Sequence, residues 1–323
     1  MNLKLENKSC PLGCSENDEA VLTGRDLLHN LPGEFSIVKC RACGLMRTNP
    51  RPTPDSIGFY YPDNYGPYQV AENTDVGVNN TSKIKPSNLK SRIKHLLGLE
   101  ARILPLMPPG RLLEIGSASG TYLLQMKQQG WQVEGIEFSA SAAQQAQDQG
   151  LAVQIATVES AKAPSAPVDI VAAWMVLEHL HDPVAALVKI RDWVKQDGYL
   201  VASVPDADSL IRKAFGNLSY DLQLPTHLYH FTPNALNKLL KHCGWQLIRV
   251  VWQRNCNTLL WSAEYLAQEK KYRNLEKLIH WLRTAKQAGK FRVLLGWILG
   301  VMRLSGRIEI WAQPISNNGQ PLP

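Results

Sequence analysis

The chain has 323 residues, of which 45% are hydrophobic and 20% charged, and its formal net charge is +7. This apolar content excludes disorder for most of the chain, and no apolar run approaches the roughly 18–20 residues that cross a bilayer as a helix. Residues 1–8 lack the apolar segment of a secretory signal peptide. We therefore expect a cytoplasmic protein, in which clustered cysteines bind metal rather than form disulfides.

The first 50 residues contain four of the six cysteines, arranged as two pairs. Three residues separate Cys10 from Cys14, and two separate Cys40 from Cys43. Paired thiols at this spacing suit tetrahedral zinc. A segment of about 50 residues with little apolar core also needs a cross-link such as a bound metal ion to fold stably. We predict a zinc-binding module over residues 1–50, with these four cysteines as the zinc ligands.

Residues 51–87 are rich in Pro, Asn, Gly and Tyr, which is typical of an extended linker, and residues 88–107 show helical spacing of apolar residues. Strands and helices then alternate. Strands are predicted at 111–116, 132–138, 152–157, 169–176, 199–204 and 245–252, and helices at 120–129, 139–149, 183–195 and 233–243. This alternation predicts an α/β core over residues 88–254 with a parallel, doubly wound sheet, which would bind its ligand at the carboxyl ends of the strands.

A turn of small residues, Glu114-Ile-Gly-Ser-Ala-Ser-Gly120, joins the first strand of this core to a helix. Small residues let the backbone approach a ligand closely, and a helix N-terminus favours an anionic group. The second strand ends in an acid, Glu137, which can accept hydrogen bonds from both hydroxyls of a ribose. A dehydrogenase would need Gly-x-Gly-x-x-Gly, and the residues at 118 and 121 are Ala and Thr.

The pattern Glu-Ile-Gly-x-x-x-Gly, followed by an acid after the second strand, resembles the class I methyltransferases that use S-adenosyl-L-methionine and have a Rossmann-like sheet. The resemblance implies that the glycine loop faces the amino-acid part of the cofactor, that Glu137 holds the ribose, and that the segment after the third strand lies by the adenine. The expected cofactor-binding residues are Glu114, Gly116, Ser117, Ala118, Gly120, Glu137, Phe138, Val158 and Trp174.

The fourth strand is followed by Val-Leu-Glu178-His179-Leu and then Asp-Pro. This stretch resembles the methyltransferase subset that includes the ubiquinone-pathway O-methyltransferases. In those relatives a Glu, a second Glu and a His near this point can hold a divalent cation, but Met175 here replaces the first Glu. The Asn/Asp-Pro-Pro-aromatic motif that nucleic-acid amino-methyltransferases commonly carry after this strand is absent, which disfavours a DNA or RNA substrate.

Two histidines, His227 and His230, lie after the fifth strand in a His-x-x-x-Phe-Thr-Pro stretch that is similar to the same family. This stretch falls where the substrate pocket is expected. An imidazole, with an ordinary pKa of about 6.5, suits the removal of a proton from a hydroxyl group. The candidate catalytic residues are His227, Glu178 and His179, and the alternative for each is that it only orients its loop.

Residues 255–306 are predicted to form a basic, helical insertion before a last core strand within residues 307–323. Residues 265–310 hold ten Lys and Arg against three acids, and this balance of +7 equals the net charge of the whole chain. Trp281 and Trp297 lie among apolar residues at helical spacing, in runs too short to span a membrane. We expect residues 265–304 to form a lid, a dimer contact or a peripheral contact with an anionic lipid surface.

The run from Cys40 to Pro52, followed by Tyr60-Tyr-Pro-Asp-Asn-Tyr65, resembles the N-terminal zinc module of some bacterial methyltransferases, many of them tied to sugar or polysaccharide modification. The resemblances imply methyl transfer from S-adenosyl-L-methionine to a small molecule, sugar or lipid-linked glycan, in the cytoplasm or at the inner face of the membrane. The alternatives are an RNA methyltransferase that contacts RNA through the zinc module and the basic segment, a dehydrogenase, and a cofactor-binding protein without turnover.

Overall fold

The computed structural model describes residues 3–61 and 102–315. Its centre is a seven-stranded sheet in the order β12-β13-β10-β9-β6-β7-β8. These strands are β6 (Arg111–Ile115), β7 (Gln132–Glu137), β8 (Ala152–Ile155), β9 (Val168–Trp174), β10 (Val194–Pro205), β12 (Trp245–Trp252) and β13 (Arg307–Pro314). Only β13 runs antiparallel to its neighbours. The predicted doubly wound, Rossmann-like sheet is therefore confirmed.

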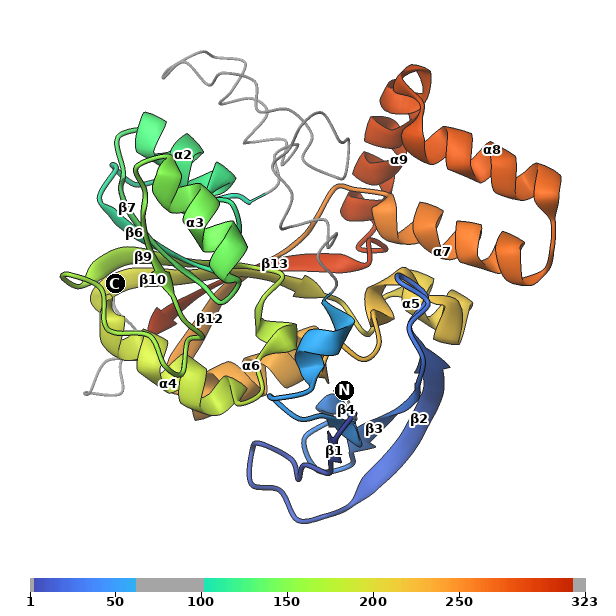
Figure 1. Cartoon of the computed structure of the whole chain (residues 1–323), viewed down its shortest axis with the longest axis horizontal. Helices are drawn as coiled ribbons and strands as arrows, with labels where there is room; N and C mark the ends of the chain where they lie inside the picture. Colours follow the sequence, from blue (N-terminus) through green and yellow to red (C-terminus); the bar gives the residue numbers. More distant parts are fainter. Residues whose placement is uncertain (1–2, 62–101, 316–323) are drawn as a thin grey trace.

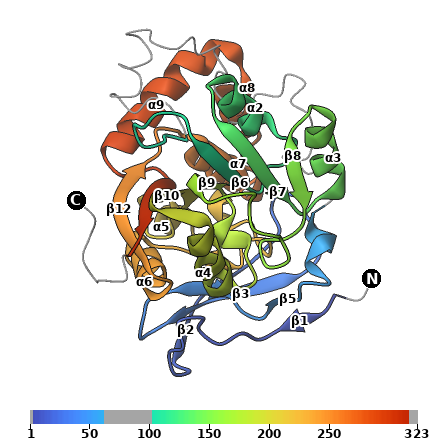
Figure 2. The same cartoon turned by 90° about the vertical axis from the view of Figure 1, so that its left-hand side faces the viewer.

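Helices cover both faces of this sheet (Figures 1 and 2). They are α2 (Thr121–Gln128) and α3 (Ala140–Asp148) on one face, and α4 (Pro183–Trp193) and α6 (Pro233–His242) on the other. Successive side chains of β6 point to opposite faces of the sheet. Leu112 packs with α2 and α3, whereas Leu113 packs with α4 and α6. Ser139, Asp182 and Thr232 cap α3, α4 and α6 through their side-chain oxygens, which agrees with the predicted starts of these helices.

The N-terminal segment forms small sheets that the sequence analysis did not predict. Their elements are β1 (Leu5–Glu6), β2 (Asp18–Arg25), β3 (Glu34–Cys40), β4 (Met46–Thr48), β5 (Arg51–Pro52) and η1 (Ile57–Tyr60). The four-stranded sheet has the order β11-β4-β3-β2, and β11 (Tyr229–His230) comes from the core. A strand of the core therefore completes the N-terminal sheet, which ties the two parts together.

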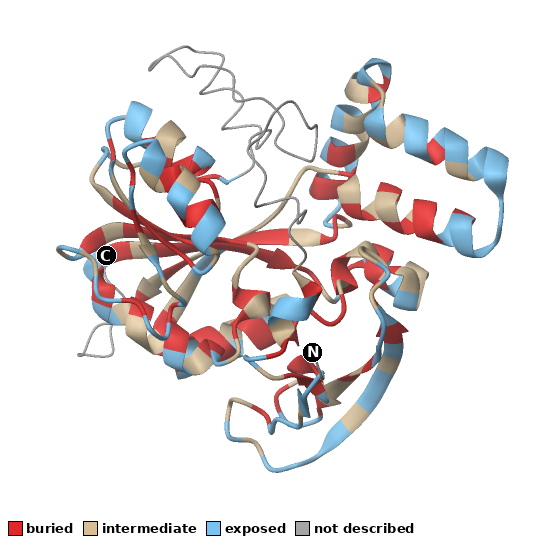
Figure 3. Ribbon diagram, viewed as in Figure 1, coloured by how far each residue is buried: buried red, intermediate tan, exposed pale blue. Residues whose placement is uncertain are grey.

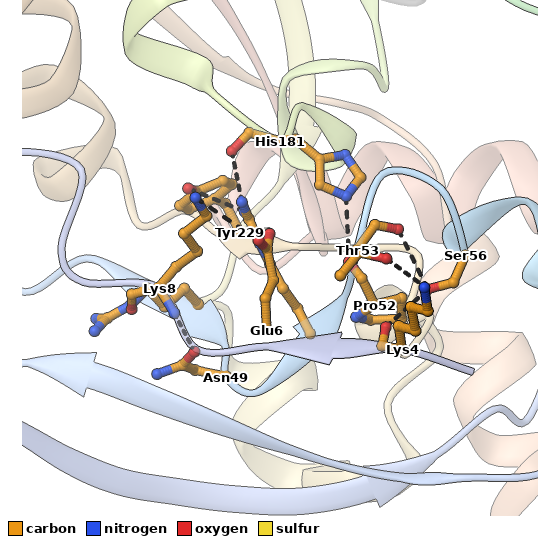
Figure 4. A network of polar contacts seen from close by, with 11 residues as sticks. Lys4, Glu6, Lys8, Asn49, Pro52, Thr53, Ser56, His181 and Tyr229 are labelled. Atoms are coloured by element: carbon orange, nitrogen blue, oxygen red, sulfur yellow. Dashed lines mark hydrogen bonds and ion pairs between the residues drawn. The ribbon is translucent and has the colours of Figure 1, made fainter. Parts of the chain in front are cut away.

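Polar contacts reinforce this junction (Figure 4). The guanidinium of Arg51 donates to the carbonyl of His181 at 2.9 Å and pairs with the carboxylate of Glu6 at 2.9 Å. The His181 ring in turn lies 3.2 Å from the carbonyl of Pro52. Arg51 is buried, so these contacts fix the N-terminal segment against the loop that follows β9.

The insertion between β12 and β13 is helical, as predicted (Figure 1). Its helices are α7 (Asn257–Glu269), α8 (Arg273–Thr284) and α9 (Gly289–Val301), with the short η6 (Lys286–Ala288) before α9. Another short group, α5 (Leu210–Phe215), η4 (Gly216–Leu218) and η5 (Tyr220–Leu222), follows β10. Within the described residues, no helix has both the length and the apolar character that crossing a membrane requires.

Two local expectations are wrong, and part of a third lies outside the described residues. The helix predicted at 183–195 ends at Trp193, and β10 begins at the next residue, five residues earlier than predicted. Gly198 therefore lies inside a strand, where a Cβ would come within 2.8 Å of the Asp169 carbonyl oxygen. Residues 102–107 are not helical: Arg102 has a φ of +63°, outside the right-handed helical region, and the amides of Arg102 and Ile103 donate to the Glu309 carboxylate at 2.7 and 3.0 Å. Residues 62–101, which include most of the predicted linker, are not described.

Candidate active site

The loop from Gly116 to Gly120 joins β6 to α2 at the carboxyl edge of the sheet. Gly116 has a φ of +70°, and a Cβ there would lie 2.7 Å from Cγ2 of Val176. The carboxylate of Glu137 accepts hydrogen bonds at 2.8 Å from the amides of Ala118 and Ser139. Glu137, the last residue of β7, therefore fixes the loop from the end of the neighbouring strand, and its expected contact with the ribose stays a prediction.

Gly120 is needed for the close packing of the glycine loop against α3. Its φ is +80°, and a Cβ there would collide with Leu151 and with Ala146 of α3. Of the residues predicted to bind the cofactor, Val158 is only 3% exposed and packs in the core, so its side chain contributes packing. Phe138 is 52% exposed.

A buried acid and a cation lie together near the glycine loop. The Glu114 carboxyl is buried and one of its oxygens has no hydrogen-bond partner among the described residues. Burial raises its pKa to about 8, although the nearby Arg102 lowers it. The Arg102 guanidinium lies over the rings of Tyr122 and Trp174, 5.3 and 5.9 Å from their centroids. Together the carboxyl and the guanidinium suit a zwitterionic ligand such as the amino-acid part of S-adenosylmethionine, whose ammonium group would favour the ionised form of Glu114.

Two other predicted cofactor residues also carry buried polar atoms. The Ser117 hydroxyl and the Trp174 indole N–H have no partner among the described residues. Unpaired buried polar atoms are costly, so their presence marks a place where a ligand would supply the missing hydrogen bonds. Arg102 was not predicted as a site residue, because it precedes the first core strand and stands in no recognisable motif.

Three side chains converge after β9. The ligand atoms of Glu178, His179 and His227 all lie within 4.8 Å of one another. Glu178 is fully buried, and neither carboxylate oxygen has a hydrogen-bond partner among the described residues. Burial raises the pKa of Glu178 to about 8. The three candidate catalytic residues are therefore brought together from η3 (Leu177–His179) and the loop before β11.

The two histidines of this cluster have defined tautomers. Nδ1 of His179 donates to the carbonyl of Thr226, and Nδ1 of His227 donates to the carbonyl of Asp221, each at 2.8 Å. Both imidazoles therefore carry their proton on Nδ1 and leave the Nε2 lone pair available. Burial lowers the pKa of His179 to about 4 and the pKa of His227 well below its ordinary value. Such a donor set can hold a shared proton or a divalent metal ion.

This acid–base cluster adjoins the glycine loop. Val176, which lies against Gly116, is two residues before Glu178. The Tyr61 ring packs against Phe138 with centroids 5.7 Å apart, and its hydroxyl lies 3.0 Å from Nδ1 of His179. Tyr61 thus connects Phe138, expected near the cofactor, with His179, expected near the methyl acceptor.

Residues that the sequence analysis did not single out hold His227 in place. Asp221, whose carbonyl orients the His227 ring, is buried, accepts a hydrogen bond from Thr258 of α7 at 3.0 Å, and lies 3.7 Å from Arg307. His230 lies 3.1 Å from the hydroxyl of Thr48, which itself donates to the carbonyl of His227 at 2.7 Å. His230 therefore has a structural role in orienting this loop.

The four N-terminal cysteines form a second cluster. The sulfur atoms of Cys10, Cys14, Cys40 and Cys43 lie within 4.8 Å of one another, and none is in a disulfide. Gly13 and Gly44, with φ values of +69° and +83°, close the two turns, and the extra residue between Cys10 and Cys14 is accommodated in the first of them. This donor set fits tetrahedral zinc.

Electrostatics at the cysteine cluster also suit a metal ligand. Burial disfavours the thiolate of Cys40, but the amides of Cys43 and Ala42 donate to it and lower its pKa to about 7. Burial raises the pKa of Cys43 to about 11. Four thiols this close cannot all ionise without a cation between them, which a metal ion provides.

Residues 88–250 match the family model described as a methyltransferase domain. The chain belongs to this family and is a class I enzyme that transfers a methyl group from S-adenosylmethionine. The match covers the doubly wound sheet up to β12, together with the glycine loop and the acid–base cluster. No curated protein matches the chain.

Among solved structures, the chain is similar to methyltransferases of low sequence identity. An S-adenosylmethionine-dependent methyltransferase from Thermotoga maritima is 22% identical over 50% of this chain and 77% of its own, with a TM-score of 0.40. Another, from Mesorhizobium loti, is 13% identical over 65% and 93% of the two chains, with a TM-score of 0.43. The magnesium protoporphyrin IX methyltransferase of Synechocystis is 18% identical over 44% and 67%, with a TM-score of 0.37.

Proposed function

We propose that this enzyme methylates a hydroxyl group of a small molecule or of a sugar, including a sugar carried on a lipid. The observation that supports this acceptor is the buried cluster of Glu178, His179 and His227 beside the glycine loop. A hydroxyl group must lose a proton as it is methylated, and this cluster offers unpaired proton acceptors at the carboxyl edge of the sheet.

Bound S-adenosylmethionine supplies an electrophilic methyl group on a positively charged sulfur. We assign the proton to Nε2 of His227, whose ring is held by the Asp221 carbonyl. As the acceptor oxygen forms its bond to the methyl carbon, the carbon–sulfur bond breaks with its electron pair going to sulfur, and the hydroxyl proton passes to His227. The Glu178 carboxyl adjoins the resulting imidazolium, and the hydrogen bond from His179 to the Thr226 carbonyl holds the His179 ring in place.

The cofactor roles follow from the same edge of the sheet. We assign the ribose hydroxyls to Glu137, the ammonium of the amino-acid part to Glu114, and its carboxylate to Arg102. Glu114 supports this assignment through its unpaired buried oxygen, and Arg102 through its place over Tyr122, in the first turn of α2. Phe138, which is half exposed beside the ribose position, supports an assignment to the adenine.

We further propose that Cys10, Cys14, Cys40 and Cys43 bind one zinc ion with a structural role. The N-terminal module resembles that of bacterial methyltransferases tied to sugar modification, and the Val-Leu-Glu178-His179 stretch resembles the ubiquinone-pathway O-methyltransferases. Both resemblances favour a hydroxyl acceptor over a nucleic acid.

The acceptor class is tested by mass spectrometry of glycans, lipids and small metabolites from the host with and without this chain. A methyl group present on a sugar or small-molecule hydroxyl only when the chain is present supports the proposal. A methyl group that disappears from RNA instead would contradict it, and would favour an enzyme that contacts RNA through the basic insertion.

A further inference from the structure

The outward face of α9 is apolar over its whole length. Phe291, Leu294, Trp297, Ile298 and Val301 recur at helical spacing and are between 38% and 58% exposed. An ordinary surface helix places polar residues on this side. An apolar face of this size on the outside of a protein marks a surface that contacts another phase or another molecule.

The opposite face of α9 is docked on the core, which fixes the apolar face outward. Gly296 and Gly300 are buried, and a Cβ on Gly296 would lie 2.7 Å from the carbonyl oxygen of Arg254. A Cβ on Gly300 would lie 2.6 Å from the Arg254 side chain. The close approach of α9 to the segment after β12 therefore requires both glycines, and the helix cannot rotate to bury its apolar side.

Helix α8 extends the apolar surface. Leu275, Leu278 and Trp281 are 45%, 52% and 48% exposed, whereas Ile279 on the adjoining side of the helix is 7% exposed. Figure 3 shows long exposed stretches along both α8 and α9, on the part of the insertion that projects from the core. With Val293 of α9, which is 53% exposed, the two helices together expose nine large apolar side chains, two of them tryptophan.

The charge of this region has one sign. From residue 270 to residue 303 the chain carries nine Lys and Arg and a single acid, Glu276. Two of the cations are engaged within the insertion, since Arg283 pairs with Glu264 and Arg292 donates to the carbonyls of Leu282 and Ala285. The exposed cations are Lys270, Lys271, Arg273, Lys277, Lys286, Lys290 and Arg303.

The position of the insertion matters as much as its composition. Strand β12 is parallel to β10, because both pair antiparallel with β13. The chain therefore leaves β12 at the carboxyl edge of the sheet, the edge that carries the glycine loop and the acid–base cluster. Helices α7 to α9 project from this side of the molecule (Figure 1).

We infer that α8 and α9 form a docking surface for an anionic lipid membrane, on which the enzyme lies with the carboxyl edge of its sheet near the bilayer. Apolar side chains with tryptophan among them enter the boundary between headgroups and acyl chains, and the surrounding lysines pair with acidic headgroups. No described helix can span a bilayer, so the contact is peripheral. Lipid docking does not depend on the identity of the methyl acceptor.

A second copy of the chain is a poorer occupant of this surface. A symmetric dimer through α8 and α9 would place the same patch on both sides of the contact. The exposed cations of both copies would then gather around one interface, with Glu276 as the single acid that residues 270–303 of each copy contribute. Like charges opposed across an interface cost free energy, whereas an anionic lipid surface complements them.

The inference is tested by cosedimentation of the full chain with two kinds of vesicle. One contains equal parts of phosphatidylcholine and phosphatidylglycerol, and the other contains phosphatidylcholine alone. Each is measured at low and at physiological salt. We expect the wild type to bind the anionic vesicles at least tenfold more tightly than the neutral ones, with weaker binding at higher salt. The double variant Leu294→Glu/Ile298→Glu should lose at least tenfold in affinity for anionic vesicles.

A matched control replaces two exposed apolar residues elsewhere, Val21 on β2 and Ile248 on β12, by glutamate. This control should bind vesicles like the wild type, and circular dichroism and S-adenosylmethionine binding should show that both double variants fold. Wild-type protein that stays in the supernatant at low salt would overturn the inference. So would equal binding by the Leu294→Glu/Ile298→Glu variant, or wild-type dimers that this variant dissociates without any vesicle binding.

Discussion

The carboxylate of Glu178 and the imidazole of His227 lie within 4.8 Å of each other, although they come from separate segments of the chain. The backbone joins these segments as well, since the amide of Leu228 donates to the carbonyl of Glu178 at 2.8 Å. The carboxylate itself has no partner among the described residues. A buried acid without a hydrogen-bond partner, beside a neutral imidazole, is suited to proton transfer and not to stabilising the fold.

The first prediction concerns turnover. Asn at position 227 keeps a polar side chain but removes the proton acceptor, so His227→Asn should lower kcat by about 10²–10⁴-fold, the usual contribution of a general base. Affinity for S-adenosylmethionine should stay within a factor of about three, because we assign His227 to the acceptor and not to the cofactor. Label transfer under single-turnover conditions measures the first effect and calorimetry the second. A variant that retains full turnover would remove His227 from the mechanism.

The second prediction concerns stability against pH. Because burial raises the pKa of Glu178 to about 8, the folded chain keeps this proton after the unfolded chain has released it. Between about pH 5 and pH 8 the unfolded state therefore binds fewer protons, and the free energy of unfolding falls as pH rises, by up to about 1.4 kcal/mol per pH unit for this group.

Glu178→Gln removes this contribution. The free energy of unfolding of the variant, relative to the wild type, should therefore rise with pH across this window. Urea titrations of both proteins at several pH values measure the difference, and comparing the two proteins cancels the contributions of other titrating groups. Curves that run parallel from about pH 5 to pH 8 would mean that Glu178 is ionised throughout.

The third prediction separates two parts of the cofactor site. Glu137→Ala should weaken binding of both S-adenosylmethionine and methylthioadenosine by about 1.5–3 kcal/mol, because both ligands carry the ribose. Arg102→Met should weaken only S-adenosylmethionine, by a similar amount, since methylthioadenosine lacks the carboxylate assigned to Arg102. Calorimetry with the two ligands gives all four values. Equal losses for both ligands in the Arg102 variant would place this residue elsewhere in the site.

The fourth prediction concerns the metal. Protein prepared with zinc available should carry one zinc ion per chain, and Cys40→Ser should lower that occupancy, whereas Cys243→Ser, at a buried cysteine outside the cluster, should not. Elemental analysis decides this. Removing zinc with a chelator should also speed hydrogen exchange at the amide of Thr48, which donates to the carbonyl of Leu228 beside His227. Metal-free protein in every preparation would refute the zinc site.

The parts of the fold that were predicted correctly are those with local signals. The capping residues Ser139, Asp182 and Thr232 mark helix starts by a side-chain contact only three residues away, and the apolar run of β9 reflects burial on both faces. The N-terminal sheet was missed because most of β2 is exposed, because β4 has only three residues, and because β4 pairs with β11, which is remote in sequence.

The same distinction applies to the site. Glu137 and the glycine loop were predicted from a strand–turn–helix pattern, and Glu178 and His227 from the stretches that contain them. Arg102 and Asp221 carry no such pattern, and their positions result from tertiary contacts, Arg102 with Glu309 and Asp221 with Arg307 and Thr258. A sequence motif therefore located the groups expected to act in chemistry, but not the groups that hold them.

The most direct test of the account is transfer of an isotopic methyl label from S-adenosylmethionine to a fractionated extract of the host, with wild-type enzyme and with His227→Asn. We predict that the wild type labels a fraction of small molecules, glycans or lipid-linked glycans, and that ribonuclease does not release the label. The His227→Asn variant should label this fraction at least about 100-fold more slowly. Label that enters RNA, or that appears equally with the variant, would contradict the assignment of a hydroxyl acceptor served by His227.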